Sequence, residues 1–85
     1  MARRYVYDRI DHRELSRRLG HLGLSARGLA RASGAGETRV MDWLSGEGDI
    51  PPHIDLLTKL WIEVPGVADT IEEWVSATCR DNRQD

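Results

Sequence analysis

The feature that most constrains this chain is the regular interruption of its apolar segments by glycine. Gly23, Gly34 and Gly46 each follow a short stretch with helical spacing, and Pro65-Gly66 makes a further break. Glycine is favoured after a helix because the left-handed conformation found there costs it least. The only β-prone stretch, Tyr5-Val6-Tyr7, is short enough to be an extended arm. The pattern predicts an all-α chain folded as a compact bundle of about five helices.

The first helix is expected over residues 12–22. Asp11 is a suitable N-cap, and Glu14 stands three residues later, as in a capping box. Ile10 before the cap is placed to contact Leu15 as a hydrophobic staple. The apolar stripe of this helix has helical spacing and is expected to be buried: Leu15, Leu19 and Leu22.

Four further helices are expected along the rest of the chain. They cover residues 26–33 with Ser25 as N-cap, residues 37–45 with Gly36 at the cap, a helix opening at Pro51-Pro52, and residues 66–80. Their predicted core-facing residues are Leu29, Val40, Trp43, Leu44, Ile54, Leu57, Leu60, Trp61, Val67, Ile71, Trp74, Val75 and Thr78. Residues 1–9 are expected to form an N-terminal arm, residues 10–80 the domain, and residues 81–85 a flexible tail.

The second and third expected helices have the spacing of a helix-turn-helix. Ala30 falls where the two helices pack closely, and Gly34 falls at the turn that needs a left-handed residue. Val40 and Trp43 fall at buried positions of the second helix of the pair. Residues 24–46 are therefore predicted to form a helix-turn-helix.

This segment resembles the Cro/lambda-repressor-like (XRE-type) helix-turn-helix family. The resemblance rests on Leu24-Ser25, the turn glycine Gly34, Val40-x-x-Trp43-Leu44 and the loop Gly46–Pro52, and it covers about residues 10–62. One departure is Ala26, where the family often has Gln. The resemblance implies a bacterial or phage regulator whose second helix lies in the major groove of double-stranded DNA.

On this model, the groove-facing helix carries the side chains that contact base edges. An Arg can bond guanine, a carboxylate can accept from cytosine, and a methyl group can touch thymine. The expected base-reading residues are Glu37, Thr38, Arg39, Met41 and Asp42. The expected phosphate contacts are Ser25, Arg27, Arg31, Ser45 and Arg17, since helix starts and arginines bind phosphate. Arg3 and Arg4, on the expected arm, are further candidates for an adjacent groove or strand.

The charge is distributed unevenly and leaves two functional classes open. Residues 1–45 hold nine arginines against five acids, whereas residues 46–85 hold three cations against nine acids. The resemblance implies a sequence-specific DNA-binding transcriptional regulator, and the basic half could face the phosphates of its DNA. Because one small module gives limited affinity, we expect it to act as a homodimer on a palindromic operator. The acidic half, with Glu37 and Asp42, favours an alternative. This is a protein-interaction module that binds another regulatory protein as an antiactivator or antitoxin-like inhibitor.

The three tryptophans are candidates for the core or for a contact between subunits. Trp43 is expected in the core, whereas Trp61 and Trp74 either fill the core or anchor an interface between subunits. The last helix is the expected dimer contact, through Ile71, Trp74 and Val75.

Other classes of protein are not supported by the residues present. Cys79 is the only cysteine, which excludes a disulfide framework and a cysteine metal cluster. The three histidines are widely spaced, and no serine lies in a nucleophile motif. We therefore expect no enzyme activity, no metal and no cofactor. No stretch has the length of a membrane helix or the character of a signal peptide, so a cytoplasmic protein with no membrane partner is expected.

Overall fold

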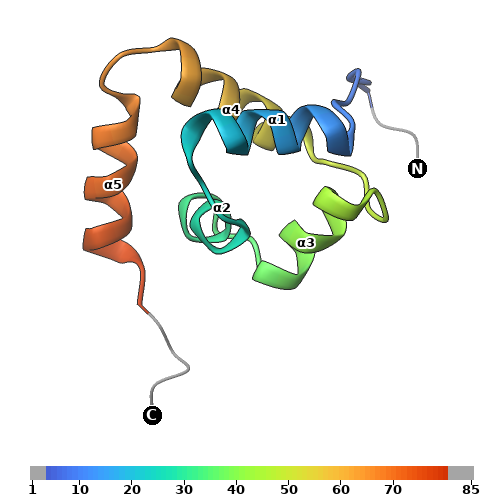
Figure 1. Cartoon of the computed structure of the whole chain (residues 1–85). Helices are drawn as coiled ribbons and strands as arrows, with labels where there is room; N and C mark the ends of the chain where they lie inside the picture. Colours follow the sequence, from blue (N-terminus) through green and yellow to red (C-terminus); the bar gives the residue numbers. More distant parts are fainter. Residues whose placement is uncertain (1–3, 81–85) are drawn as a thin grey trace.

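The computed structural model describes residues 4–80, and within this range the only regular elements are five helices. They are α1 (His12–Leu22), α2 (Ala26–Ser33), α3 (Glu37–Ser45), α4 (Pro52–Glu63) and α5 (Val67–Thr78). Helix α1 packs along α4, α2 and α3 lie below them, and α5 closes one side (Figure 1). The expected all-α class is confirmed. The expected tail lies outside the described residues, as do the first three residues of the expected arm.

The helices begin and end where local sequence signals place them. The Asp11 carboxylate accepts a hydrogen bond from the backbone N–H of Glu14 (2.9 Å). The Ser25 hydroxyl oxygen accepts one from the N–H of Gly28 (3.1 Å). Only half of the expected capping box forms, because the Glu14 side chain pairs with two arginines instead. The last helix is shorter than the expected 66–80 and ends at Thr78.

The core lies where α1, α2, α3 and α4 meet. The side chains of Leu15, Leu29, Val40 and Ile54 are fully buried, and Trp43 is 3% exposed. The expected core position of Trp43 is thus confirmed. The residues preceding the first two N-caps also pack against this core, as expected for hydrophobic staples: Ile10 and Leu24.

The later helices bury less of their apolar surface than the sequence predicts. Leu60 is 40% exposed and Trp74 is 48% exposed, so the core positions expected for both are wrong. Trp61 is half-buried. In α5, Val75 is buried whereas Thr78 is exposed. The reason is that α5 packs on α2 and α4 along one edge only and leaves its other sides open (Figure 1).

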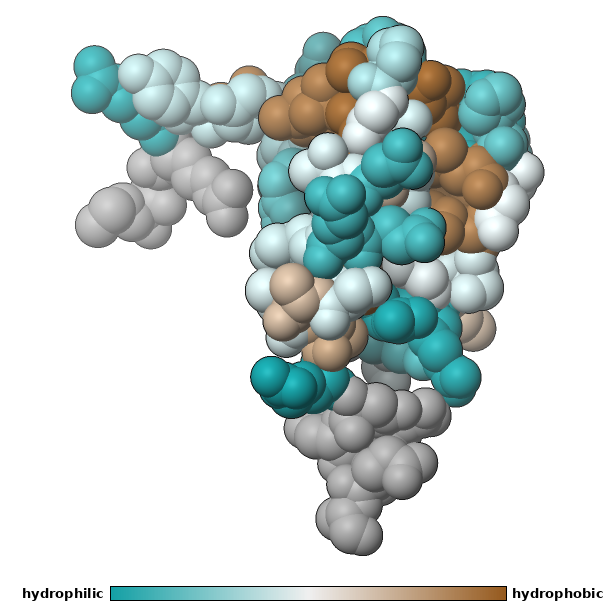
Figure 2. Space-filling model, turned by 90° about the vertical axis from the view of Figure 1, so that its left-hand side faces the viewer, coloured by the Kyte–Doolittle hydropathy of each residue, from teal (hydrophilic) through white to brown (hydrophobic). Residues whose placement is uncertain are grey.

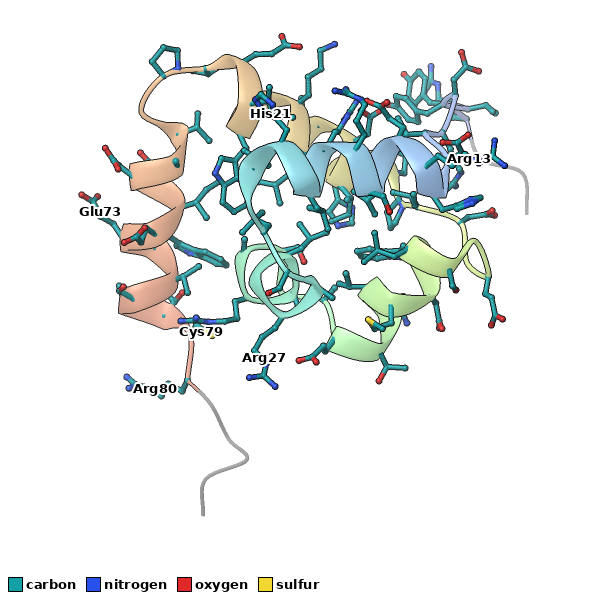
Figure 3. All side chains as sticks on the ribbon, viewed as in Figure 1. Arg13, His21, Arg27, Glu73, Cys79 and Arg80 are labelled. Atoms are coloured by element: carbon teal, nitrogen blue, oxygen red, sulfur yellow. The ribbon has the colours of Figure 1, made fainter. Side chains whose placement is uncertain are left out.

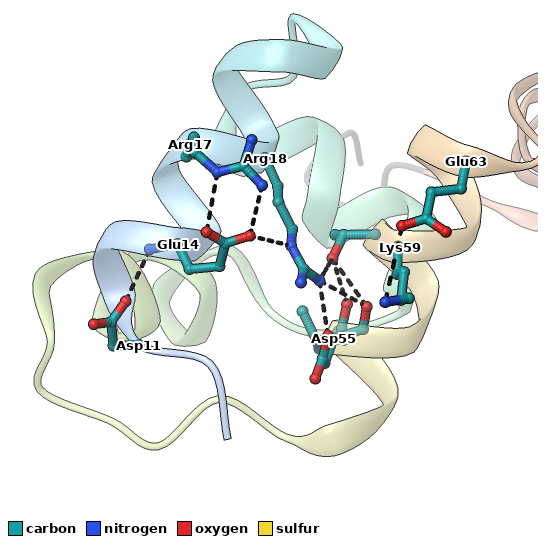
Figure 4. A network of polar contacts seen from close by, with 9 residues as sticks. Asp11, Glu14, Arg17, Arg18, Asp55, Lys59 and Glu63 are labelled. Atoms are coloured by element: carbon teal, nitrogen blue, oxygen red, sulfur yellow. Dashed lines mark hydrogen bonds and ion pairs between the residues drawn. The ribbon is translucent and has the colours of Figure 1, made fainter. Parts of the chain in front are cut away.

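A charged cluster joins α1 to α4. Arg18 donates to the Asp55 carboxylate (2.8 Å), to the Asp55 backbone carbonyl (3.0 Å) and to the Thr58 hydroxyl oxygen (3.0 Å), as Figure 4 shows. It also pairs with Glu14 at 2.8 Å. Thr58 is fully buried and donates its hydroxyl to the Ile54 carbonyl (2.9 Å). Within the described residues every buried side-chain polar atom has a partner.

Candidate nucleic-acid interface

Helices α2 and α3 form the expected helix-turn-helix. Gly34 ends α2 in the left-handed region (φ 79°), and its N–H donates to the Ala30 carbonyl (2.9 Å). The Ser33 hydroxyl oxygen then accepts from the N–H of Ala35 (3.2 Å). Because the turn is this tight, α3 begins directly after Gly36, which caps it without a side-chain hydrogen bond. Burial of Leu29 and Val40 fixes the two helices against the core.

The side of α3 opposite the core is exposed along its whole length. At 100° per residue, the residues furthest from Val40 and Trp43 share one face. All of them are exposed: Thr38, Met41, Asp42 and Ser45. Nine helical residues span roughly 13 Å, a length that fits within a DNA major groove. We call these four residues the outer face of α3.

Arg39 lies at the edge of this outer face. It lines a hollow at the turn with Trp43, Pro51 and His53. Glu37, in the first turn of α3, is exposed at the other edge. Of the five expected base-reading residues, the structure therefore places Thr38, Met41 and Asp42 on the outer face, with Glu37 and Arg39 beside it. The outer face holds one acid and no cation.

An ion pair connects the first turns of α2 and α3. Arg27 Nε lies 3.2 Å from Glu37 Oε2, and both side chains are more than half exposed. In Figure 3, Arg27 projects from the side of α2 that faces away from α1. Ser25, two residues earlier, has its hydroxyl oxygen occupied by Gly28 N–H. Its O–H remains able to donate. The start of α2 thus offers a hydroxyl donor and a partly neutralised arginine.

The other expected phosphate contacts lie apart from this pair. Arg17 is bound to Glu14 through two hydrogen bonds of 3.0 and 2.7 Å. Arg31 is exposed and lines a groove between α2 and α5. The Ser45 hydroxyl donates to the Asp42 carbonyl (3.0 Å). Among the expected phosphate contacts, only Ser25 and Arg27 meet at one helix start.

The charges on α1 are strongly coupled. Hydrogen bonds from Arg17 and Arg18 lower the pKa of Glu14 from its ordinary value of 4.5 to about 2. The same contact with Glu14 raises the pKa of Arg17. Burial alone would lower the pKa of Arg18, but hydrogen bonds to Glu14 and Asp55 outweigh it and raise that pKa. These three groups therefore stay charged at ordinary pH.

Sequence reasoning missed the structural use of Arg18 and the burial of Thr58. Glu14 stands four residues before Arg18, a spacing that brings side chains together on a helix, so half of that cluster was detectable. Asp55 is distant in the sequence, and no local signal connects it to Arg18.

Of the expected dimer contacts, Val75 is buried within the chain and Ile71 is half-buried. Trp74 is the one of the three that is substantially exposed.

Two further observations concern residues 4–80. That range contains no group of three His, Cys, Asp or Glu arranged to hold a metal ion. None of its helices is both long and apolar enough to cross a membrane.

Comparison of the chain with family models, with curated proteins and with solved structures finds no match. The resemblance to the XRE-type family therefore rests on the residues of this chain alone.

Proposed function

We propose that this chain is a small sequence-specific DNA-binding transcriptional regulator of the XRE type, with double-stranded DNA as its partner. In this proposal α3 enters the major groove, and the protein acts in the cytoplasm as a homodimer on a palindromic operator. The observation that carries the proposal is the outer face of α3. Its four exposed residues point away from the side of the same helix that is anchored by buried Val40 and Trp43. A rigid helix presented in this way is the element that helix-turn-helix proteins place in the groove.

The outer face favours particular base edges. Thr38 and Met41 offer methyl groups that suit the methyl of thymine, and the Asp42 carboxylate suits the amino group of cytosine. Arg39 lies at the edge of this face, and in this proposal it contacts a phosphate. We therefore expect an operator half-site whose contacted bases are thymine and cytosine.

The start of α2 supplies the phosphate contact in this proposal. The Ser25 hydroxyl, the first backbone N–H groups of α2 and Arg27 lie at the positive end of the helix dipole. Arg27 must exchange Glu37 for a phosphate oxygen. Such exposed ion pairs are worth about 1 kcal/mol or less, so the exchange costs little.

The test is selection of bound sequences from a random duplex library at low salt, followed by affinity measurements over a range of salt. We expect the logarithm of the binding constant to fall linearly with the logarithm of salt concentration. Asp42→Ala should relax the base preference at one position and weaken specific binding about tenfold. Thr70→Ala, an exposed substitution on α5, is the control and should leave affinity unchanged. Absence of binding at low salt contradicts the proposal.

A second candidate is the protein-interaction module. It is favoured by the absence of a cation from the outer face of α3 and by the Arg27–Glu37 pair. Under this alternative the outer face contacts another regulatory protein and not a base pair. Failure to bind DNA, together with a purified regulator whose binding is lost in both Met41→Ala and Asp42→Ala, would establish it.

A further inference from the structure

The outward side of α4 carries an unpartnered apolar stripe. Leu56 is 57% exposed, Leu60 is 40% exposed and Val64, at the C-cap, is 43% exposed. The four-residue spacing aligns them on one side, whereas Ile54 and Thr58 on the opposite side are fully buried. Figure 2 shows hydrophobic surface gathered at the end of the molecule where α4 meets α5. A contiguous apolar stripe of this kind marks an interaction surface more reliably than scattered exposed residues do.

One edge of the stripe carries a pair of opposite charges. Lys59 Nζ lies 3.8 Å from Glu63 Oε2, and both side chains are more than half exposed (Figure 4). A lysine and a glutamate that lie four residues apart on a helix exchange positions when the helix is turned end to end. The edge of the stripe is therefore complementary to its own reversed copy.

We propose that a second copy of this chain docks on the stripe, with the two α4 helices antiparallel about a two-fold axis level with Trp61. With a rise of about 1.5 Å per residue, Lys59 and Glu63 lie about 3 Å to either side of this level. Lys59 of each copy is then level with Glu63 of the other, on the same edge. The stripe residues of the two copies alternate along the axis about every 3 Å, so they interleave without meeting head-on. The contact is isologous, as a closed dimer requires.

The small area of the stripe determines how strongly the two copies associate. Three apolar side chains and one charged edge make a patch well below the roughly 800 Å² per partner of a standard stable interface. The dimer is therefore weak and forms in the micromolar range or above. It uses α4, whereas the sequence pointed to α5 through Trp74.

The first test is analytical ultracentrifugation of the full chain without DNA, from about 1 μM to 1 mM, so that the outcome is independent of the proposed function. We expect a monomer–dimer equilibrium. Leu60→Glu should weaken it at least tenfold, because two carboxylates would be buried at the two-fold axis. Trp74→Glu on α5 and Met41→Glu on α3 place the same charge at other exposed apolar residues and should leave the equilibrium unchanged. Circular dichroism confirms that each variant is folded.

The second test uses the charged edge and needs no change to the apolar residues. Lys59→Glu and Glu63→Lys, each alone, place like charges opposite one another and should weaken self-association about fivefold. An equimolar mixture of the two variants restores both attractions and should form a mixed dimer more readily than either variant forms its own. The proposal is overturned if the wild type is monomeric throughout the range, or if Trp74→Glu abolishes the dimer while Leu60→Glu keeps it. It is also overturned if the mixture associates no better than the separate variants.

Discussion

Two arginines of this protein, Arg18 and Arg27, each pair with a glutamate, yet their surroundings differ. The Arg18 side chain is 12% exposed and binds Glu14, Asp55 and Thr58 across two helices. The Arg27 side chain is 57% exposed and, among residues 4–80, forms one ion pair, with Glu37 at 3.2 Å. A buried cation cannot lose its partners without a large cost, whereas an exposed one exchanges them readily. Arg18 therefore holds the fold together, and Arg27 is available to a ligand.

The largest effect is expected from Arg18→Ala. It leaves the Asp55 carboxylate between α1 and α4 without its ion-pair partner and removes the donor to the Thr58 hydroxyl oxygen. Breaking a largely buried pair costs about 3 kcal/mol of the free energy of unfolding. Urea denaturation measures it. Arg17→Ala removes an exposed arginine bound to the same Glu14 and should lower the free energy of unfolding far less. Equal losses in the free energy of unfolding of the two variants would contradict the difference between buried and exposed arginines.

A smaller loss in the free energy of unfolding is expected from Gly34→Ala. This variant tests whether the α2–α3 region depends on its turn and not on the Arg27–Glu37 ion pair. Gly34 has φ of 79°, and a side chain there is strained by about 1 kcal/mol or slightly more, although nothing lies within 4 Å of the new Cβ. Gly36→Ala is the matched control, because Gly36 has an ordinary φ and equally open surroundings. Thermal unfolding of both variants measures the difference. A control as unstable as Gly34→Ala would mean that strain at the turn is not the cause.

Glu37→Gln should strengthen DNA binding, and this effect is expected to be smaller than the two losses of stability above. It releases Arg27 from its ion pair with Glu37 and removes a charge that repels phosphate. We expect about threefold tighter binding and a steeper salt dependence, whereas Arg27→Ala should weaken binding and flatten that dependence. Fluorescence polarisation with the selected duplex measures both. Glu73→Gln removes an equal charge from the outward side of α5 and serves as control (Figure 3). Equal gains from Glu37→Gln and Glu73→Gln would indicate a general charge effect.

The smallest effect concerns the exposed part of the α1 cluster. Hydrogen bonds from Arg17 and Arg18 hold the pKa of Glu14 at about 2 in the folded chain, below its ordinary 4.5. The unfolded chain therefore takes up the proton first, so this stabilisation is complete above about pH 4.5 and is lost as the pH falls towards 2. Glu14→Gln should make the unfolding midpoint less dependent on pH within this window. A pH profile identical to the wild type would show that the contact contributes no stability.

Residues near one another in the sequence determined the local structure of this protein. The caps at Asp11 and Ser25, and the glycines that end the first three helices, place the bounds of α1, α2 and α3 where the pattern predicts them. These signals act over three or four residues, so they do not depend on what packs against the helix. The buried side of α3 is likewise encoded by the spacing of Val40 and Trp43.

The tertiary structure alone decided which residues meet across helices. It brought Arg18 to Asp55 and Thr58, placed Arg39 in one hollow with His53, and left Trp74 and Leu60 exposed. Each of these outcomes depends on how far one helix covers another, and an amphipathic pattern does not specify that coverage. The helix-turn-helix could therefore be predicted from the sequence. The roles of its arginines, and the apolar side that α4 leaves open, follow only from the packing.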